Sequence, residues 1–179
     1  EGIIESHELI SIPIVEDSLV LVCGKNHEFY EKDLVLASEL EGRKFAIREK
    51  GSGTRKLFEQ YLSSHNIHIR IAWEANCPRT ILNAVIYNNA LAVMSQRLVK
   101  HECMHQAVKI FRYENDAWDR YFKLVCLKQT ADSSSPSDCP VSDSITSPGI
   151  QTLQSVLNRY RALQLPEEIP ACVFKNDVI

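Results

Sequence analysis

The sequence lacks any long hydrophobic run and any excess of one sign of charge. No apolar stretch reaches the roughly 18 residues that a membrane helix needs, and the first residues, EGIIESHELI, are acidic rather than basic as in a signal peptide. The 20 Lys and Arg residues oppose 23 Asp and Glu residues, so no broad basic surface is available for nucleic acid or anionic lipid. We therefore expect a cytoplasmic protein with no membrane partner, whose own residues do not contact DNA.

Paired cysteines are also missing. The six cysteines, at positions 23, 77, 103, 126, 139 and 172, are widely and irregularly spaced, and they form no C-x-x-C pair of the zinc or redox type. We expect free thiols in a reducing cytoplasm rather than a disulfide framework, and we predict neither a metal nor a cofactor.

A glycine-rich loop, GSGTR at 51–55, precedes a helical pattern but is not a P-loop, which has four residues between its glycines and a Lys before the Ser or Thr. A helix N-terminus with exposed N–H groups and nearby cations can hold an anion. The alternative is a solvated charged face. The cations that flank the loop are Arg48, Lys50, Arg55 and Lys56.

The string HECMH, residues 101–105, has the His-Glu-x-x-His spacing of zinc hydrolases, in which a helix presents two imidazoles and a general base on one face. Its context disagrees, because the expected helix starts only a few residues earlier and a strand pattern follows His105 directly. A solvated helix end is therefore favoured over a metal site. A third zinc ligand would have to come from Glu114, Asp116 or Asp119.

Short apolar runs alternate with amphipathic segments along most of the chain, and this alternation predicts an α/β domain with largely parallel strands. In the segment that follows residue 75, Asn76 or Cys77 can cap a helix that has Pro78 in its first turn. The pattern predicts strands at 8–15, 18–23, 43–49, 67–75, 90–95, 107–113 and 120–128, and helices at 54–66, 78–89, 96–103 and 148–163.

Four segments in this order, IPIVEDSLVLVCGKNHEF, REKGSGTRKLFEQYL, NCPRTILNAVIYNNALAVMSQRLV and YFKLVCLK, resemble the effector-binding domain of LysR-type transcriptional regulators. The resemblance covers about residues 1–128. It implies an α/β, two-lobe, periplasmic-binding-protein-like (type II) architecture whose first lobe is incomplete, because the chain starts after that family's first strand, helix and ligand loop. The expected divisions are 1–31, lobe I with crossover strands; 32–110, an inserted lobe II; 111–128, a return strand; 129–147, a flexible Ser/Pro-rich segment; and 148–179, a C-terminal helix and tail.

The resemblance further implies a ligand-sensing domain rather than an enzyme. A small-molecule effector would bind between the lobes. It would be an anion, because N–H donors and short polar side chains suit one. The domain would act within a homo-oligomer, a dimer or tetramer, and would reach DNA only through a helix-turn-helix domain absent from this chain. Carried over by position, the expected ligand contacts are Asn76, Cys77, Ser52, Gly53, Thr54 and Cys23. The alternatives are a solute-binding protein of a transporter, which needs an export signal, and the zinc hydrolase.

Overall fold

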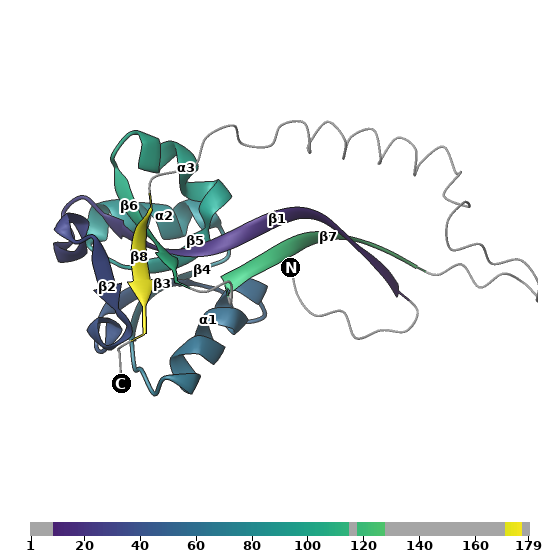
Figure 1. Cartoon of the computed structure of the whole chain (residues 1–179), viewed down its shortest axis with the longest axis horizontal. Coiled ribbons are helices and arrows are strands. Elements are labelled where there is room, and N and C mark those ends of the chain that lie inside the picture. Colours follow the sequence, from purple (N-terminus) through teal and green to yellow (C-terminus); the bar gives the residue numbers. More distant parts are fainter. Residues whose placement is uncertain (1–8, 115–117, 128–170, 177–179) are drawn as a thin grey trace, which may run out of the picture. The chain divides into compact units, whose positions relative to one another are not determined.

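The computed structural model describes residues 9–114, 118–127 and 171–176. The chain divides into unit 1, residues 1–2, 16–122 and 169–179, and unit 2, residues 3–15 and 123–168. Strands β1 (Leu9–Gly24) and β7 (Asp119–Leu127) belong to both units (Figure 1). Unit 1 also contains β2 (Leu34–Leu36), β3 (Lys44–Arg48), α1 (Gly53–Ser64), β4 (Arg70–Ala75), α2 (Pro78–Asn88), β5 (Ala92–Ser95), α3 (Gln96–Met104), β6 (Val108–Tyr113), β8 (Cys172–Lys175) and the 3₁₀ helices η1 (Glu28–Glu31) and η2 (Ala37–Leu40). The divisions expected from the sequence stay a prediction.

The sheet of unit 1 is mixed rather than largely parallel. Its strand order among the described residues is β2-β8-β6-β1-β5, with β7 also paired to β1. Strand β1 runs antiparallel to both β5 and β6, whereas β8 is parallel to β6 and β2. Beyond β5, the N–H of Ala46 donates to the carbonyl of Leu91 at 2.8 Å, so β3 lies parallel to the start of β5, and β3 pairs in parallel with β4.

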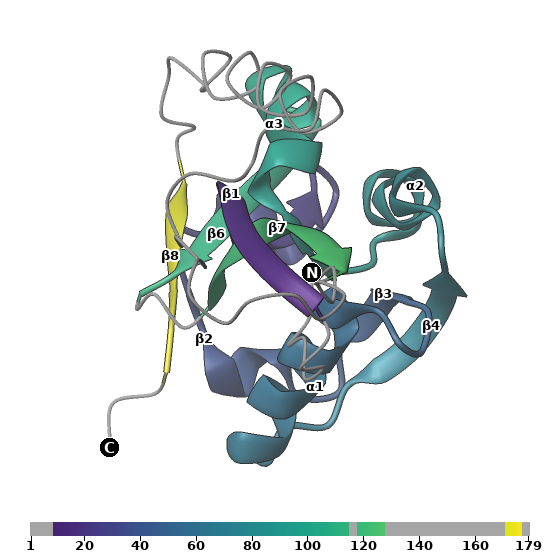
Figure 2. The same ribbon diagram turned by 90° about the vertical axis from the view of Figure 1, so that its right-hand side faces the viewer.

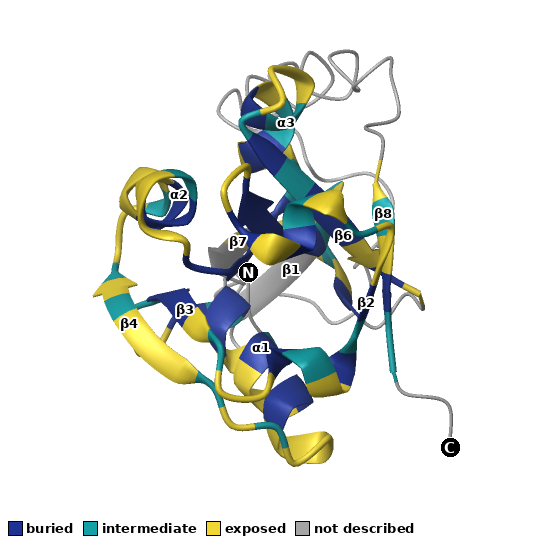
Figure 3. Cartoon of the chain, turned by 90° about the vertical axis from the view of Figure 1, so that its left-hand side faces the viewer, coloured by how far each residue is buried: buried dark blue, intermediate teal, exposed yellow. Residues whose placement is uncertain are grey.

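Alternate residues of the strands enter two apolar layers, one on each face of the sheet. Helix α1 covers the first layer and helices α2 and α3 cover the second (Figures 2 and 3). Strand β1 contributes to both because each of its residues from 19 to 23 is buried, as its unbroken apolar run predicts. The first layer includes Leu19, Leu21, Phe45, Phe58, Tyr61, Phe111, Trp118 and Phe174, and the second includes Val20, Val22, Ala46, Ile81, Leu82, Val85, Val99 and Ile110.

Most helix bounds agree with the sequence pattern. Helix α2 has Cys77 as its N-cap and Pro78 in its first turn, and it ends at Asn89, whose φ of 53° is the left-handed geometry that asparagine tolerates. The helix expected at 148–163 and the Ser/Pro-rich segment lie outside the described residues.

One strand expectation is wrong, and one strand was not expected. The runs 8–15 and 18–23 form one strand, β1, because the acidic step between them is hydrogen-bonded within the sheet and does not turn the chain. The short strand β8 has no sequence pattern of its own, since its four residues are held in place by parallel pairing with β6 and β2.

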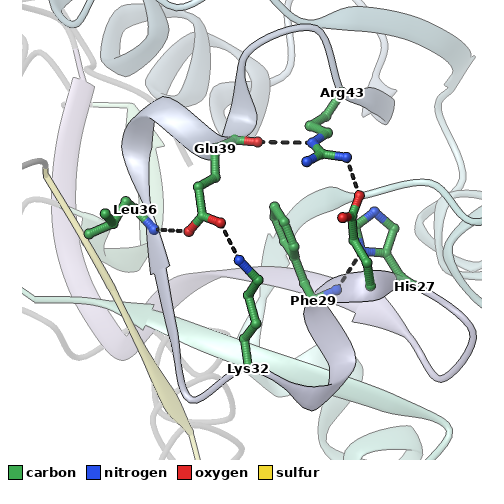
Figure 4. Close-up of polar contacts among 7 residues, drawn as sticks. His27, Phe29, Lys32, Leu36, Glu39 and Arg43 are labelled. Carbon is green, nitrogen blue, oxygen red and sulfur yellow. Dashed lines mark hydrogen bonds and ion pairs between the residues drawn. The ribbon is translucent and has the colours of Figure 1, made fainter.

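The connection from β1 to β3 is held by polar contacts around the two 3₁₀ helices (Figure 4). The carboxylate of Glu39 accepts the N–H of Leu36 at 2.9 Å and forms an ion pair with Lys32. Arg43 donates to the carbonyl of Glu39 at 3.0 Å, and its guanidinium lies 5.4 Å from the centre of the Phe29 ring. These contacts fix the chain beneath the first apolar layer, so we assign them a structural role.

The fit between β1 and α2 depends on Gly24. A Cβ atom at this position would lie 2.4 Å from the carbonyl oxygen of Val85, closer than packed atoms tolerate. We expect Gly24→Ala to lower the free energy of unfolding by about 2–3 kcal/mol, because backbone must move to make room. Lys25→Ala, at the exposed next position, is the control and should stay within about 0.5 kcal/mol. Urea unfolding measures both, and equal stability of the two variants would contradict the close approach.

His27 makes the stability of unit 1 depend on pH. Its Nδ1 accepts the N–H of Phe29 at 3.1 Å at the start of η1, which requires the neutral ring. Burial lowers the pKa of His27 below its ordinary 6.5, against an opposing effect of Glu28. The unfolded chain therefore binds a proton more readily than the folded chain. The stability that His27 contributes is present above its ordinary pKa of 6.5 and is lost as the pH falls from there towards the lowered pKa of the folded state.

We expect His27→Asn, which retains an acceptor but does not titrate, to flatten the fall in melting temperature between about pH 7.5 and about pH 5. His101→Asn, at an exposed histidine, should keep the slope of the unmodified protein. Thermal denaturation across this range is the measurement, and parallel profiles for all three proteins would refute the assignment.

Candidate functional site

Three helices begin at one edge of the sheet. Strands β4, β3 and β5 are parallel, and the last residues of β3 and β4, Arg48 and Ala75, are register partners. Helices α1, α2 and α3 are the next elements after β3, β4 and β5, so all three start at the carboxyl ends of these strands. In α/β sheets, ligands bind in crevices at this edge. The loops 49–52 and 76–77, far apart in sequence, therefore meet here.

The start of α1 contains three of the expected contacts. Ser52 is the N-cap residue, but within the described structure its hydroxyl makes no capping hydrogen bond. Gly53 is half-buried and opens the helix. Thr54 is 5% exposed, and its Oγ1 accepts from the Nη1 of Arg120 at 2.9 Å. Thr54 is thus linked to β7 and not to its own helix turn.

The start of α2 contains two more of the expected ligand contacts. Asn76 and Cys77 are both exposed. The N–H groups of Thr80 and Arg79 face the thiol and, with the Thr80 hydroxyl and the charge of Arg48, lower the pKa of Cys77, although none of them closes a capping hydrogen bond. Arg48, at the end of β3, has the smallest of these effects, in keeping with the register that pairs it with Ala75 at the end of β4.

Cys23 lies elsewhere. It is fully buried in the first apolar layer, where burial raises the pKa of its thiol to about 12. In the register of β1 and β5, Val22 opposes Ala92 at the beginning of β5, whereas Leu19 opposes Ser95 at its end. Cys23 is therefore at the opposite edge from the starts of the three helices.

A buried polar cluster, which we call the Asp17 cluster, joins this edge to β1. It consists of Asp17, Ser95, Arg120 and Thr54. The Nε of Arg120 lies 2.8 Å from one carboxylate oxygen of Asp17, and Ser95 donates to the other at 2.6 Å. Ser95 also caps α3 by accepting the N–H of Arg97 at 3.2 Å. Sequence reasoning named Thr54 but missed Asp17, Ser95 and Arg120, although an acidic residue inside an apolar strand run was a usable signal.

The cations near the glycine loop have different roles. Arg55 is 7% exposed and donates to the carbonyl of Arg48 at 3.1 Å and to the carboxylates of Glu59 at 2.6 Å and Glu74 at 2.7 Å. It therefore braces α1 against β3 and β4. Lys50 and Lys56 are exposed.

The HECMH segment lies at the end of α3, with His105 as its C-cap. Glu102, which would be the general base of a zinc hydrolase, forms an ion pair with Arg79 of α2. The rings of His101 and His105 have centroids 4.4 Å apart, and no group of three potential ligands suited to a metal is found among the described residues. The segment ties α3 to α2.

The sequence profile of the LysR substrate binding domain matches residues 1–135. The chain belongs to this family. None of the helices in its described part is long and apolar enough to cross a membrane. In this LysR substrate-binding domain, the edge where the helices begin is the candidate binding site.

Curated relatives of the domain are named as transcriptional regulators. It is 27% identical over 128 residues to the HTH-type transcriptional regulator CysL of Bacillus subtilis, covering 69% of this chain and 43% of CysL. It is 29% identical over 102 residues to the uncharacterized HTH-type transcriptional regulator YeiE of Escherichia coli K12, covering 57% of this chain and 34% of YeiE. The chain thus spans less than half the length of either relative.

Solved structures share its fold. The regulatory domain of CcmR from Synechocystis PCC6803 in complex with 2-PG has a TM-score of 0.69 at 21% identity, over 89% of this chain and 70% of that one. The effector binding domain of QuiR in complex with shikimate has a TM-score of 0.66 at 18% identity, over 91% and 70%. The type II periplasmic-binding-protein-like fold predicted from the sequence is therefore confirmed.

Cys77 should be the fastest-reacting thiol among those described. We expect iodoacetamide at about pH 7 to alkylate it roughly tenfold or more faster than Cys103, because the pKa of Cys77 is lowered and its thiol exposed, whereas burial raises the pKa of Cys103. Peptide mass spectrometry over a time course gives both rates. Thr80→Val removes one hydroxyl but keeps both amides, and should slow Cys77 only slightly. Equal rates for the two cysteines would contradict the assignment.

Proposed function

We propose that this domain binds a small anionic effector at the edge where α1, α2 and α3 begin. The observation that carries the proposal is the meeting of three helix N-termini at the ends of parallel strands. In the described structure, the first turns of these helices contain no acidic residue, so nothing in them offsets the positive end of each helix dipole. An anion can be held there by backbone N–H groups.

The proposed contacts come from the two loops that meet at this edge. Ser52, Gly53 and Thr54 offer hydroxyls and a close approach to the backbone of α1, and Asn76 and Cys77 offer exposed polar groups at the start of α2. Short polar side chains beside N–H donors suit a carboxylate, sulfate or phosphate group. Cys23 is left out of the proposed contacts because it is fully buried at the other edge.

For the whole protein, we infer a LysR-type transcriptional regulator that uses this domain as its sensor. Binding would shift the arrangement of a cytoplasmic homo-oligomer, a dimer or tetramer, that contacts DNA through a helix-turn-helix domain outside this chain. The names of CysL and YeiE favour this function over transport by a solute-binding protein. The QuiR and CcmR complexes support a small-molecule ligand.

A thermal-shift panel of sulfate, shikimate, other small carboxylates and amino acids tests the binding site. We expect at least one anion to raise the melting temperature in proportion to the logarithm of its concentration, because it binds the folded state alone. Ser52→Ala and Asn76→Ala should each lower the affinity for that ligand by roughly threefold to tenfold, which corresponds to the loss of about one hydrogen bond.

Matched controls are available on the same helices. Ser63→Ala, at the end of α1, and Asn83→Ala, in the middle of α2, change the same residue types at exposed positions away from the edge. They should leave the affinity unchanged. A panel without any shift, tested on the chain and on the full regulator, would count against an anion sensor, and equal losses in the site and control variants would place the ligand elsewhere.

A further inference from the structure

Strands β1 and β7 are joined by consecutive side-chain pairs where they pass from unit 1 into unit 2. Tyr121 donates to Glu16 at 3.0 Å, Arg120 pairs with Asp17, and Ser18 donates to Asp119. Each step forward along β1 is matched by one step back along β7, as in an antiparallel ladder. Residues 9–15 of β1 and 123–127 of β7 belong to unit 2, so these pairs lie at the last residues before both strands leave unit 1.

The central pair of this ladder is the buried one. The side chain of Asp17 is fully buried and that of Arg120 is 13% exposed, whereas Glu16, Asp119 and Tyr121 are exposed. A buried ion pair loses much of its stabilisation when either partner is removed, because the other charge is left uncompensated. The exposed pairs on either side contribute little by comparison. Among the side-chain pairs that join the two strands, the Asp17–Arg120 pair is therefore the strongest.

Arg120 extends this connection to α1. Its Nε faces Asp17 and its Nη1 donates to the Oγ1 of Thr54 in the first turn of the helix. The guanidinium is planar and rigid, so a change in direction at one nitrogen changes the geometry at the other. Arg120 thus bridges Asp17 and Thr54.

We propose that Arg120 is a positioning residue that couples the start of α1 to the two strands connecting the units. A displacement of Thr54 at the edge of the sheet is passed through the guanidinium to Asp17, and so to both β1 and β7 at the residues where they leave unit 1. The functional significance of this coupling rests on the proposed function, in which an anionic effector binds at the first turn of α1. A negative group there also competes with Asp17 for Arg120, which weakens the connection between the strands.

Hydrogen exchange without any ligand tests the coupling in the whole chain. Thr54→Val keeps the size of the side chain and removes the acceptor. We expect it to raise the exchange rate of amides in 9–15 and 123–127 by roughly fivefold, the effect of about one lost hydrogen bond. Thr54→Ser, which keeps the hydroxyl, should restore the slow rates. In an Arg120→Met background, Thr54→Val should have no further effect on these segments.

Thr80→Val is the matched control, because Thr80 lies in the first turn of α2 and has no link to Arg120 among the described contacts. It should leave the exchange of both segments unchanged. The proposal is overturned if Thr54→Val changes exchange only within α1, or if Thr80→Val affects the strands equally. If Arg120→Met does not fold, the comparison of Thr54→Val with Thr54→Ser and with Thr80→Val decides whether the coupling exists. No ligand is added in this experiment, so a negative result would not count against the proposed effector site, which the thermal-shift panel tests. Failure of that panel would likewise not count against this coupling.

Discussion

A carboxylate buried inside an apolar strand has to be neutralised, and much of the arrangement of unit 1 at the candidate binding edge follows from how Asp17 meets this requirement. An isolated buried charge would cost several kcal/mol or more, so the carboxylate needs both an opposite charge and hydrogen-bond donors. The cation comes from β7 and the donor from the end of β5. One side chain thus fixes β1 relative to β7 and β5 and keeps β1 continuous where the sequence pattern predicts a break.

The parallel order of β4, β3 and β5 decides what this edge can do. Parallel strands require crossover helices, and each helix here begins where its strand ends. The N-termini of α1, α2 and α3 are brought together as a consequence of the topology, without any motif that a sequence search for nucleotide loops or metal sites would find. Arg55, which resembled an anion-binding cation in sequence, is instead the brace that holds α1 on β3 and β4.

Related domains with the same fold bind different small ligands. The same fold is seen in the CcmR domain bound to 2-PG and in the QuiR domain bound to shikimate, so divergent sequences can hold different small ligands on a common framework. In this chain the edge includes Cys77, an exposed thiol with a lowered pKa beside the loop of α1. The HECMH segment shows the opposite case, in which a catalytic spacing serves the packing of two helices.

The sequence by itself determined the class of fold, the helices α1, α2 and α3, the buried core of β1, and the loops that contain Ser52 and Asn76. These features depend on local periodicity and capping, which neighbouring residues encode. Tertiary structure alone decided the continuity of β1, the existence of β8, the position of Cys23 at the opposite edge and the roles of Asp17, Arg120 and Arg55. Each of these depends on a partner that is distant in the chain, and long-range pairing in strands and ion pairs leaves no periodic trace in a single sequence.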